Sequence, residues 1–158
     1  MQMAKQLSVT LANKPGRLSA MLAALNKEKV TCRALSVMDS GERGTVRFVP
    51  DNFAAAAKIL EKINVRSDSA DVLLVEVPNQ MGAFEKICER LAADHLNIDY
   101  AYCSFNSAGA ARGAKTGVLA VVKVNDLAKA QRVLGENGAA AARTARRKAP
   151  VRRPVFAR

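Results

Sequence analysis

An internal repeat constrains the fold of this chain more than any other sequence feature. The segment 7–18, LSVTLANKPGRL, aligns with 73–84, LLVEVPNQMGAF, at a constant offset of 66 residues. Both copies carry an Asn and, three positions later, a Gly. Further along, 51–60 aligns with 125–134 at an offset of 74. Similarity at a fixed spacing indicates one structural unit used twice, so the sequence predicts two copies of a small domain.

The hydrophobic periodicity within the first copy predicts the element order βαββαβ. Apolar residues at 7, 9 and 11 alternate as in a strand with one buried face, and those at 18, 21, 22 and 25 follow helical spacing after Pro15-Gly16. Asn13 is placed to cap this helix. Two β-like segments, a second helix and a short strand are then expected at 30–38, 45–49, 53–60 and 64–67. This order predicts an α+β fold of two ferredoxin-like α/β sandwiches, each with two helices on one face of an antiparallel sheet.

The second copy repeats this order but departs from it at the end. Its elements are expected at 72–77, 83–93, 97–105, 117–123 and 126–134, with a longer hairpin loop over 106–116. The last strand would fall on Ala139–Arg143, which is almost all Ala and forms strands poorly. Either that edge strand is missing or a tail segment such as Pro154–Ala157 supplies it. We therefore expect units at 5–69 and 70–138 and a mostly disordered basic tail at 139–158.

The turn between the first strand and first helix carries the family resemblance. A strand ending in Asn-x-Pro-Gly-x-Leu before an amphipathic helix, in a βαββαβ unit of this length, resembles the ACT domain. The first copy fits this pattern, whereas the second has Met81 where Pro is usual. To about residue 138 the chain is similar to small tandem-ACT proteins without a catalytic domain. The resemblance implies a regulatory protein that binds a free amino acid, with ACT units side by side in an eight-stranded sheet and the ligand at their seam.

The resemblance also implies which residues bind the ligand: the strand–helix turn of one unit and the second strand of its neighbour. The turn residues are Asn13, Lys14, Pro15, Gly16, Arg17 and Leu18, and Asn79, Gln80, Met81, Gly82, Ala83 and Phe84. The facing strands hold Leu35, Ser36, Val37 and Met38, and Tyr100, Ala101, Tyr102 and Cys103. A Gly lets the backbone approach a ligand, the helix start attracts its carboxylate, and an Asn oxygen accepts from its ammonium. The same turn also forms well without any ligand.

Nothing in the sequence predicts catalysis. No nucleophile–base motif is present, and the 109–116 segment has the wrong spacing for a phosphate loop. His95 is the sole histidine, and Cys32, Cys88 and Cys103 lack the short spacing of a metal site. We therefore expect a protein that is not an enzyme and has no cofactor or metal. The sequence shows no signal peptide, and its longest apolar runs are far shorter than a membrane span. We therefore expect a cytoplasmic protein with reduced thiols and no membrane contact.

The charge distribution leaves two other functions open. The formal charge is +11, and 139–158 contributes seven Lys or Arg and no acid. This tail favours weak, salt-dependent contact with a polyanion, although the strand 43–49 lacks the aromatic residues on which an RNA reader stacks bases. The alternatives are therefore a basic nucleic-acid-associated adaptor whose ACT-like folds only mediate assembly, and a chain that regulates an amino-acid-biosynthetic enzyme. An open apolar strand edge also predicts a homodimer.

Overall fold

The computed structural model of the chain describes residues 1–104 and 117–135. The expected hairpin loop at 106–116 and the tail at 139–158 lie outside these ranges. The elements are β1 (Gln2–Ala12), α1 (Arg17–Lys27), β2 (Cys32–Ser40), β3 (Arg43–Pro50), α2 (Phe53–Lys62), β4 (Ser67–Pro78), α3 (Ala83–Ala93), β5 (Ile98–Ser104), β6 (Gly117–Val124) and a helix over 127–135. The predicted α+β class and the repeated order of strands and helices are confirmed. No helix in the described ranges has the length and apolar character needed to cross a membrane.

The strands form one antiparallel sheet in the order β2-β3-β1-β4-β6-β5. The two units share it through β1 and β4, which pair from Gln2↔Leu74 to Val9↔Ser67. The first part of β4 is the fourth strand of the first unit, and its second part is the first strand of the second unit. Of the short strand expected at 64–67, only Ser67 lies in a strand, and this strand continues without a break through the one expected at 72–77. The predicted boundary between residues 69 and 70 falls inside it.

The amino-terminal end of β1 provides the fourth strand of the second unit. Gln2, Met3 and Ala4 pair with β4 from Leu74 back to Val72. The repeat predicts that this edge is either absent or completed by the tail; in the structure β1 occupies the place beside β4. The two units thus share β1 and β4: the first unit takes its fourth strand from the start of β4, and the second unit takes its fourth strand from the start of β1. Backbone groups that an isolated unit would leave unpaired are paired across the junction of the two units.

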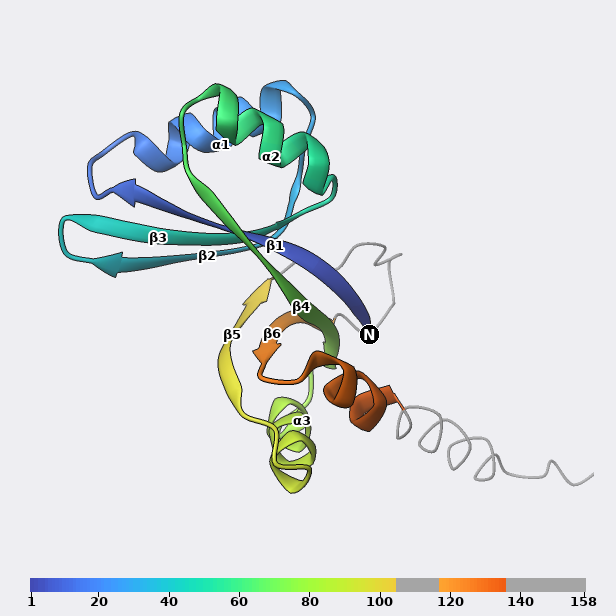
Figure 1. Cartoon of the computed structure of the whole chain (residues 1–158). Coiled ribbons are helices and arrows are strands. Elements are labelled where there is room, and N and C mark those ends of the chain that lie inside the picture. The colour runs from blue at the N-terminus through green and yellow to red at the C-terminus, as the bar shows by residue number, and fades with distance from the viewer. Residues whose placement is uncertain (105–116, 136–158) are drawn as a thin grey trace, which may run out of the picture.

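The two units stack with their helices outside and their helix-free sheet faces together (Figure 1). In the first unit α1 and α2 cover a core that includes Leu7, Leu25 and Phe48. In the second unit α3 and the 127–135 helix cover a separate core. A third cluster fills the space between the sheet faces and consists of Ala34, Val49, Val72, Leu74 and Val121. This middle layer also brings the two end strands, β2 and β5, close to each other.

Candidate functional site

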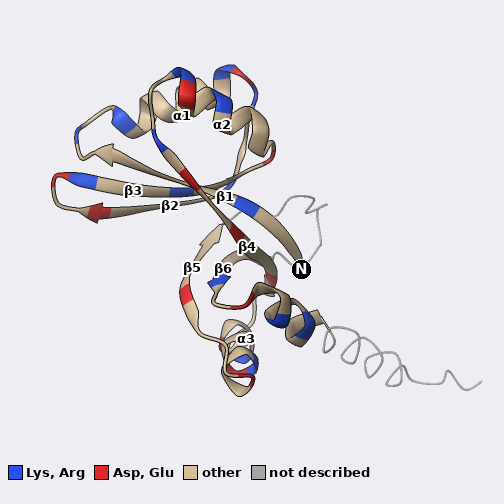
Figure 2. Ribbon diagram, in the orientation of Figure 1, with Lys and Arg blue, Asp and Glu red and all other residues tan. Residues whose placement is uncertain are grey.

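The first strand–helix turn leaves the start of α1 open to an anion. Gly16 is the N-cap residue and has φ 86°, a left-handed conformation that favours Gly. No side chain caps the helix, and its first turn contains no acidic residue. Lys14 and Arg17 are exposed beside it, so this turn is marked by basic residues (Figure 2). The amide groups and positive dipole end of α1 therefore favour a carboxylate here.

Asn13 holds this turn against the β2–β3 hairpin of its own unit. Its backbone N–H donates to the Glu42 carbonyl at 2.9 Å. Its side-chain Nδ2 donates to Asp39 Oδ1 at 3.0 Å and to the Gly41 carbonyl at 3.1 Å. The expectation that Asn13 caps α1 is wrong, because its amide group points to the hairpin instead. The side-chain donor is occupied, and the Oδ1 oxygen is the group left to accept from a ligand ammonium.

The second turn has the same backbone but a different electrostatic environment. Gly82 is again a left-handed N-cap residue, with φ 74° and no side-chain cap. Glu85 lies in the first turn of α3, and its Oε2 is 3.3 Å from where a Cβ on Gly82 would stand. This carboxylate already occupies the favourable place at the positive helix end. Met81, which replaces the usual Pro, is fully exposed.

The β2 residues expected to face a ligand differ in their burial. Leu35 packs against the first core, and Ser36 is half-buried. Val37 and Met38 are 53% and 49% exposed. Because β2 is the end strand of the described sheet, its outer backbone edge has no strand partner there. An apolar end strand of this kind is suited to pairing with another chain.

The β5 tyrosines take part in the contact between the two units. Tyr100 and Tyr102 lie on one side of β5 and reach Gln6 of β1, which is 0% exposed. Gln6 Nε2 donates to the Tyr100 hydroxyl at 2.7 Å, and the Tyr102 hydroxyl donates to Gln6 Oε1 at 3.0 Å. The Arg47 guanidinium lies 4.5 Å from the centroid of the Tyr100 ring. Burial is the main cause that raises the pKa of the Tyr102 hydroxyl, and electrostatic interaction with Tyr100 raises this pKa further.

The structure therefore assembles only part of the predicted site within one chain. It places the first turn beside the hairpin of its own unit, and it engages both tyrosine hydroxyls with Gln6. Ala101 and Cys103 are exposed on β5. Among the described residues no hydrogen bond joins either turn to the second strand of the other unit. β2 and β5 are the two end strands of the sheet and lie close to each other, but among the described residues no strand pairing joins them.

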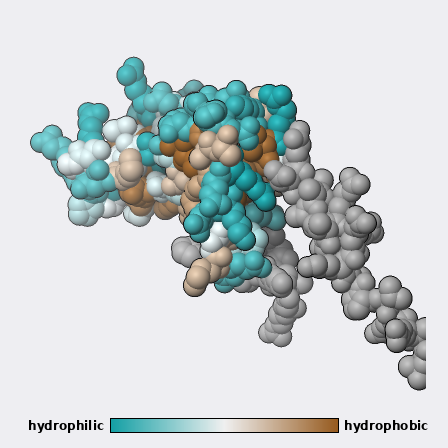
Figure 3. Space-filling view, turned by 90° about the horizontal axis from the view of Figure 1, so that it is seen from below, coloured by the Kyte–Doolittle hydropathy of each residue, from teal (hydrophilic) through white to brown (hydrophobic). Residues whose placement is uncertain are grey.

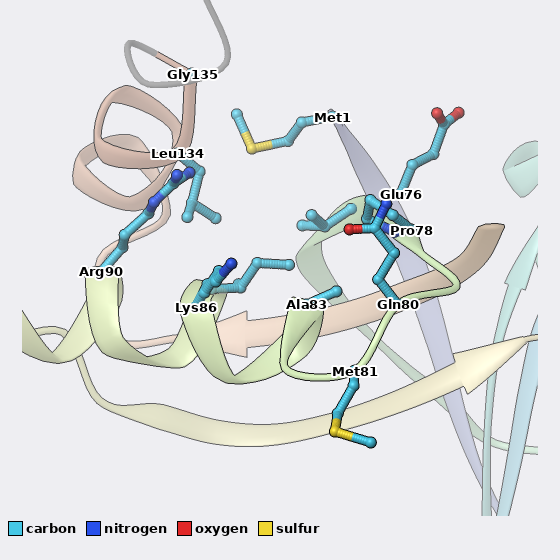
Figure 4. A pocket seen from close by; sticks show the side chains of 12 residues that line it. Met1, Glu76, Pro78, Gln80, Met81, Ala83, Lys86, Arg90, Leu134 and Gly135 are labelled. Atoms are coloured by element: carbon cyan, nitrogen blue, oxygen red, sulfur yellow. The ribbon is translucent and has the colours of Figure 1, made fainter. Parts of the chain in front are cut away.

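Two features of the structure are not predicted from the sequence. One is the Gln6–tyrosine cluster, whose only sequence signal is a polar residue beside alternating apolar ones. The other is a pocket of about 610 Å³ next to the second turn, lined in part by Gln80, Met81 and Ala83 (Figure 4). Within the described residues, no three His, Cys, Asp or Glu side chains lie close enough together to hold a metal ion.

Comparisons with known proteins agree with this architecture. Residues 1–142 match the family described as the ACT domain pair. Protein BT0572 from Bacteroides thetaiotaomicron is 29% identical, with a TM-score of 0.76 over 86% of this chain and 89% of that one. The regulatory subunit of aspartate kinase from Thermus thermophilus, in its ligand-free form, is 13% identical, with a TM-score of 0.61 over 85% and 94% of the two chains. No curated protein sequence matches the chain. The family match covers most of its length, and the chain belongs to the ACT domain pair family.

Proposed function

We propose that this protein binds a free amino acid at its first strand–helix turn and transmits the bound state to a partner. The observation that carries the proposal is the open start of α1. Left-handed Gly16 exposes the helix amides, no acid competes for them, and Asn13 is fixed with its side-chain oxygen available. An amino acid presents a carboxylate for the helix end and an ammonium for that oxygen, so its two charged groups match the two kinds of group in the turn.

In this proposal, a second copy of the chain completes the ligand site. The exposed Val37 and Met38 lie on the end strand β2, on the same hairpin that Asn13 contacts. A homodimer formed through this edge would bury both side chains and place another copy's strand next to the first turn. In this proposal, the seam that holds the ligand lies between two chains and not between the two units of one chain.

The two turns are not equivalent in the proposal. The second turn has Glu85 beside Gly82, and a ligand carboxylate there meets a like charge. The first turn has no such residue. We therefore assign amino-acid binding to the residues at 13–18, and we expect those at 79–84 to bind weakly or not at all.

The proposed partner is an enzyme whose activity responds to the amino acid. An ACT domain pair is a regulatory module, and one protein of the same fold is a regulatory subunit of aspartate kinase. Binding shifts an assembly equilibrium only by the difference in affinity between the two states, so the ligand has to favour one assembly over another. The regulated enzyme is tested by co-purification in the presence and absence of the amino acid.

A panel of the twenty common amino acids tests the proposal through thermal unfolding. A ligand at about 100 times its Kd adds roughly 2.7 kcal/mol to stability, which raises the melting temperature by about 5–10 °C. Gly16→Val should remove this gain, whereas Gly82→Val introduces the same kind of backbone strain in the second turn and should retain it. Equal stabilisation of both variants, or no stabilisation of the parent, contradicts the proposal.

The basic tail supports a second candidate, a nucleic-acid-associated adaptor. Residues 139–158 contribute seven basic groups and no acid, and such a segment neutralises phosphates in a salt-dependent manner. Removing the residues after Gly138 should abolish DNA binding at low salt while leaving amino-acid binding intact. If DNA binding survives the truncation, the tail does not account for it.

A further inference from the structure

The second unit contains a pocket that the proposed amino-acid site does not use. It measures about 610 Å³, a volume typical of small-molecule sites. Its walls come from α3, the 127–135 helix, the second part of β4 and Met1 before β1 (Figure 4). Seen from the side of this unit, hydrophobic side chains reach the surface between hydrophilic ones (Figure 3).

The repeat allows the residues of this pocket to be compared with the matching positions of the first unit. Three apolar side chains, Val75, Ile87 and Leu134, line the pocket and are 7%, 9% and 8% exposed. Their counterparts in the first unit, Val9, Met21 and Leu60, are 1%, 1% and 0% exposed. All six residues are buried, and the three that line the pocket keep slightly more exposed surface than their counterparts in the first unit.

Strand pairing explains the difference. In the first unit Val9 pairs with Ser67, and Val65 packs over the neighbouring core. In the second unit β1 pairs with β4 only as far as Gln2↔Leu74. From Val75 onward β4 has a partner only in β6 among the described residues. Among the described residues, no second strand therefore lies beside this stretch of β4.

Two basic side chains line the pocket next to its apolar residues. Lys86 and Arg90 lie one turn apart on α3, and both line the pocket. The aligned positions in the first unit are Ala20 and Ala24, so the first unit has no cations at these two positions. Like charges four residues apart on a helix repel each other, and a bound anion relieves that repulsion. Glu76, the acidic residue of the lining, points its carboxylate away from them (Figure 4).

We propose that this pocket binds a small organic carboxylate with an apolar body and no ammonium group. The carboxylate lies between Lys86 and Arg90, and the apolar body covers Val75, Ile87 and Leu134. An α-ammonium is disfavoured because no carboxylate of the described lining is directed at this space. The site differs from the amino-acid site in its residues, its ligand and its unit. A ligand here also touches Met1, which precedes the strand that both units share.

Calorimetric titration of the full-length protein with octanoate tests this proposal. Octanoate should bind, and octanamide, which has the same length but no charge, should bind at least about ten-fold more weakly because it loses the charged hydrogen bonds. The double variant Lys86→Gln, Arg90→Gln should weaken octanoate binding by a similar factor. Its matched control is Lys58→Gln, Lys62→Gln, which removes two exposed cations with the same spacing on α2.

The outcomes separate this proposal from the proposed function. Octanoate binding should be unchanged in Gly16→Val, and leucine, which adds an ammonium, should not compete for the pocket. The proposal is overturned if octanoate fails to bind at millimolar concentration, if octanamide binds equally well, or if the control variant loses as much affinity as the pocket variant. None of these results depends on whether an amino acid binds the first turn.

Discussion

Replacing Gln6 by Leu tests whether the polar cluster between the units holds them together. Gln6 is completely buried, and its amide group satisfies the hydroxyls of Tyr100 and Tyr102 as well as Ser8 Oγ at 3.1 Å. Leu has a similar volume but its side chain makes no hydrogen bond. The substitution therefore leaves the hydroxyls of Tyr100 and Tyr102 without their Gln6 partner between the sheet faces. An unsatisfied buried polar group costs about 1–3 kcal/mol. We expect Gln6→Leu to lower the free energy of unfolding by about 2–5 kcal/mol.

Urea denaturation at pH 7 measures this loss, and a triple variant provides the control. Gln6→Leu combined with Tyr100→Phe and Tyr102→Phe removes both sides of the cluster, and such paired replacement is close to neutral. The triple variant should therefore recover most of the stability that the single variant loses, which a double-mutant cycle expresses as a coupling energy. The reasoning is refuted if Gln6→Leu costs less than about 1 kcal/mol, or if the triple variant is no more stable than the single one.

Three further predictions follow from particular contacts. Burial raises the pKa of Tyr102, so the folded state keeps this proton longer than the unfolded state; the stability it contributes is complete below pH 10 and is lost at higher pH, and Tyr102→Phe should flatten the fall that urea denaturation measures as the pH rises above 10. Asn52→Ala should cost about 1 kcal/mol in thermal unfolding, because Asn52 Oδ1 accepts from the Ala55 N–H at 3.1 Å as the cap of α2; an unchanged melting temperature would argue against this cap. Glu85→Gln should open the second turn and raise the calorimetric stoichiometry of amino-acid binding from one to two per chain, and an unchanged stoichiometry would show that Glu85 does not block it.

The repeat and its periodicities predict most of the fold because local patterns determine it. Alternation at 7–11 and helical spacing after Gly16 specify β1 and α1, and the same reasoning holds in the second copy. The unbroken apolar run Val72–Val75 indicates a strand buried on both faces, and β4 does contribute Leu73 and Val75 to one core and Val72 and Leu74 to another.

The contacts between the units are not predictable in the same way. Gln6 and Tyr100 are 94 residues apart, and neither carries a local sign that they meet. The partner strand of Gln2–Ala4 likewise depends on how the two units dock, not on the propensity of those residues. The assignment of Asn13 as a helix cap was wrong for a related reason. The local pattern favours capping, but in the fold the Asn13 side chain donates to Asp39 and to the Gly41 carbonyl of the β2–β3 hairpin, which lies 26–28 residues further along the chain.

Linkage between dimerisation and amino-acid binding tests the central claim most directly. The amino acid identified by the thermal panel is titrated calorimetrically into the parent and into Val37→Lys, which places a charge on the exposed edge of β2. Ile63→Lys, at another exposed apolar residue, serves as the control. The account predicts that Val37→Lys is monomeric and loses the binding heat, whereas Ile63→Lys behaves as the parent. A monomeric Val37→Lys that binds the amino acid with the parent Kd would contradict a site shared between two copies.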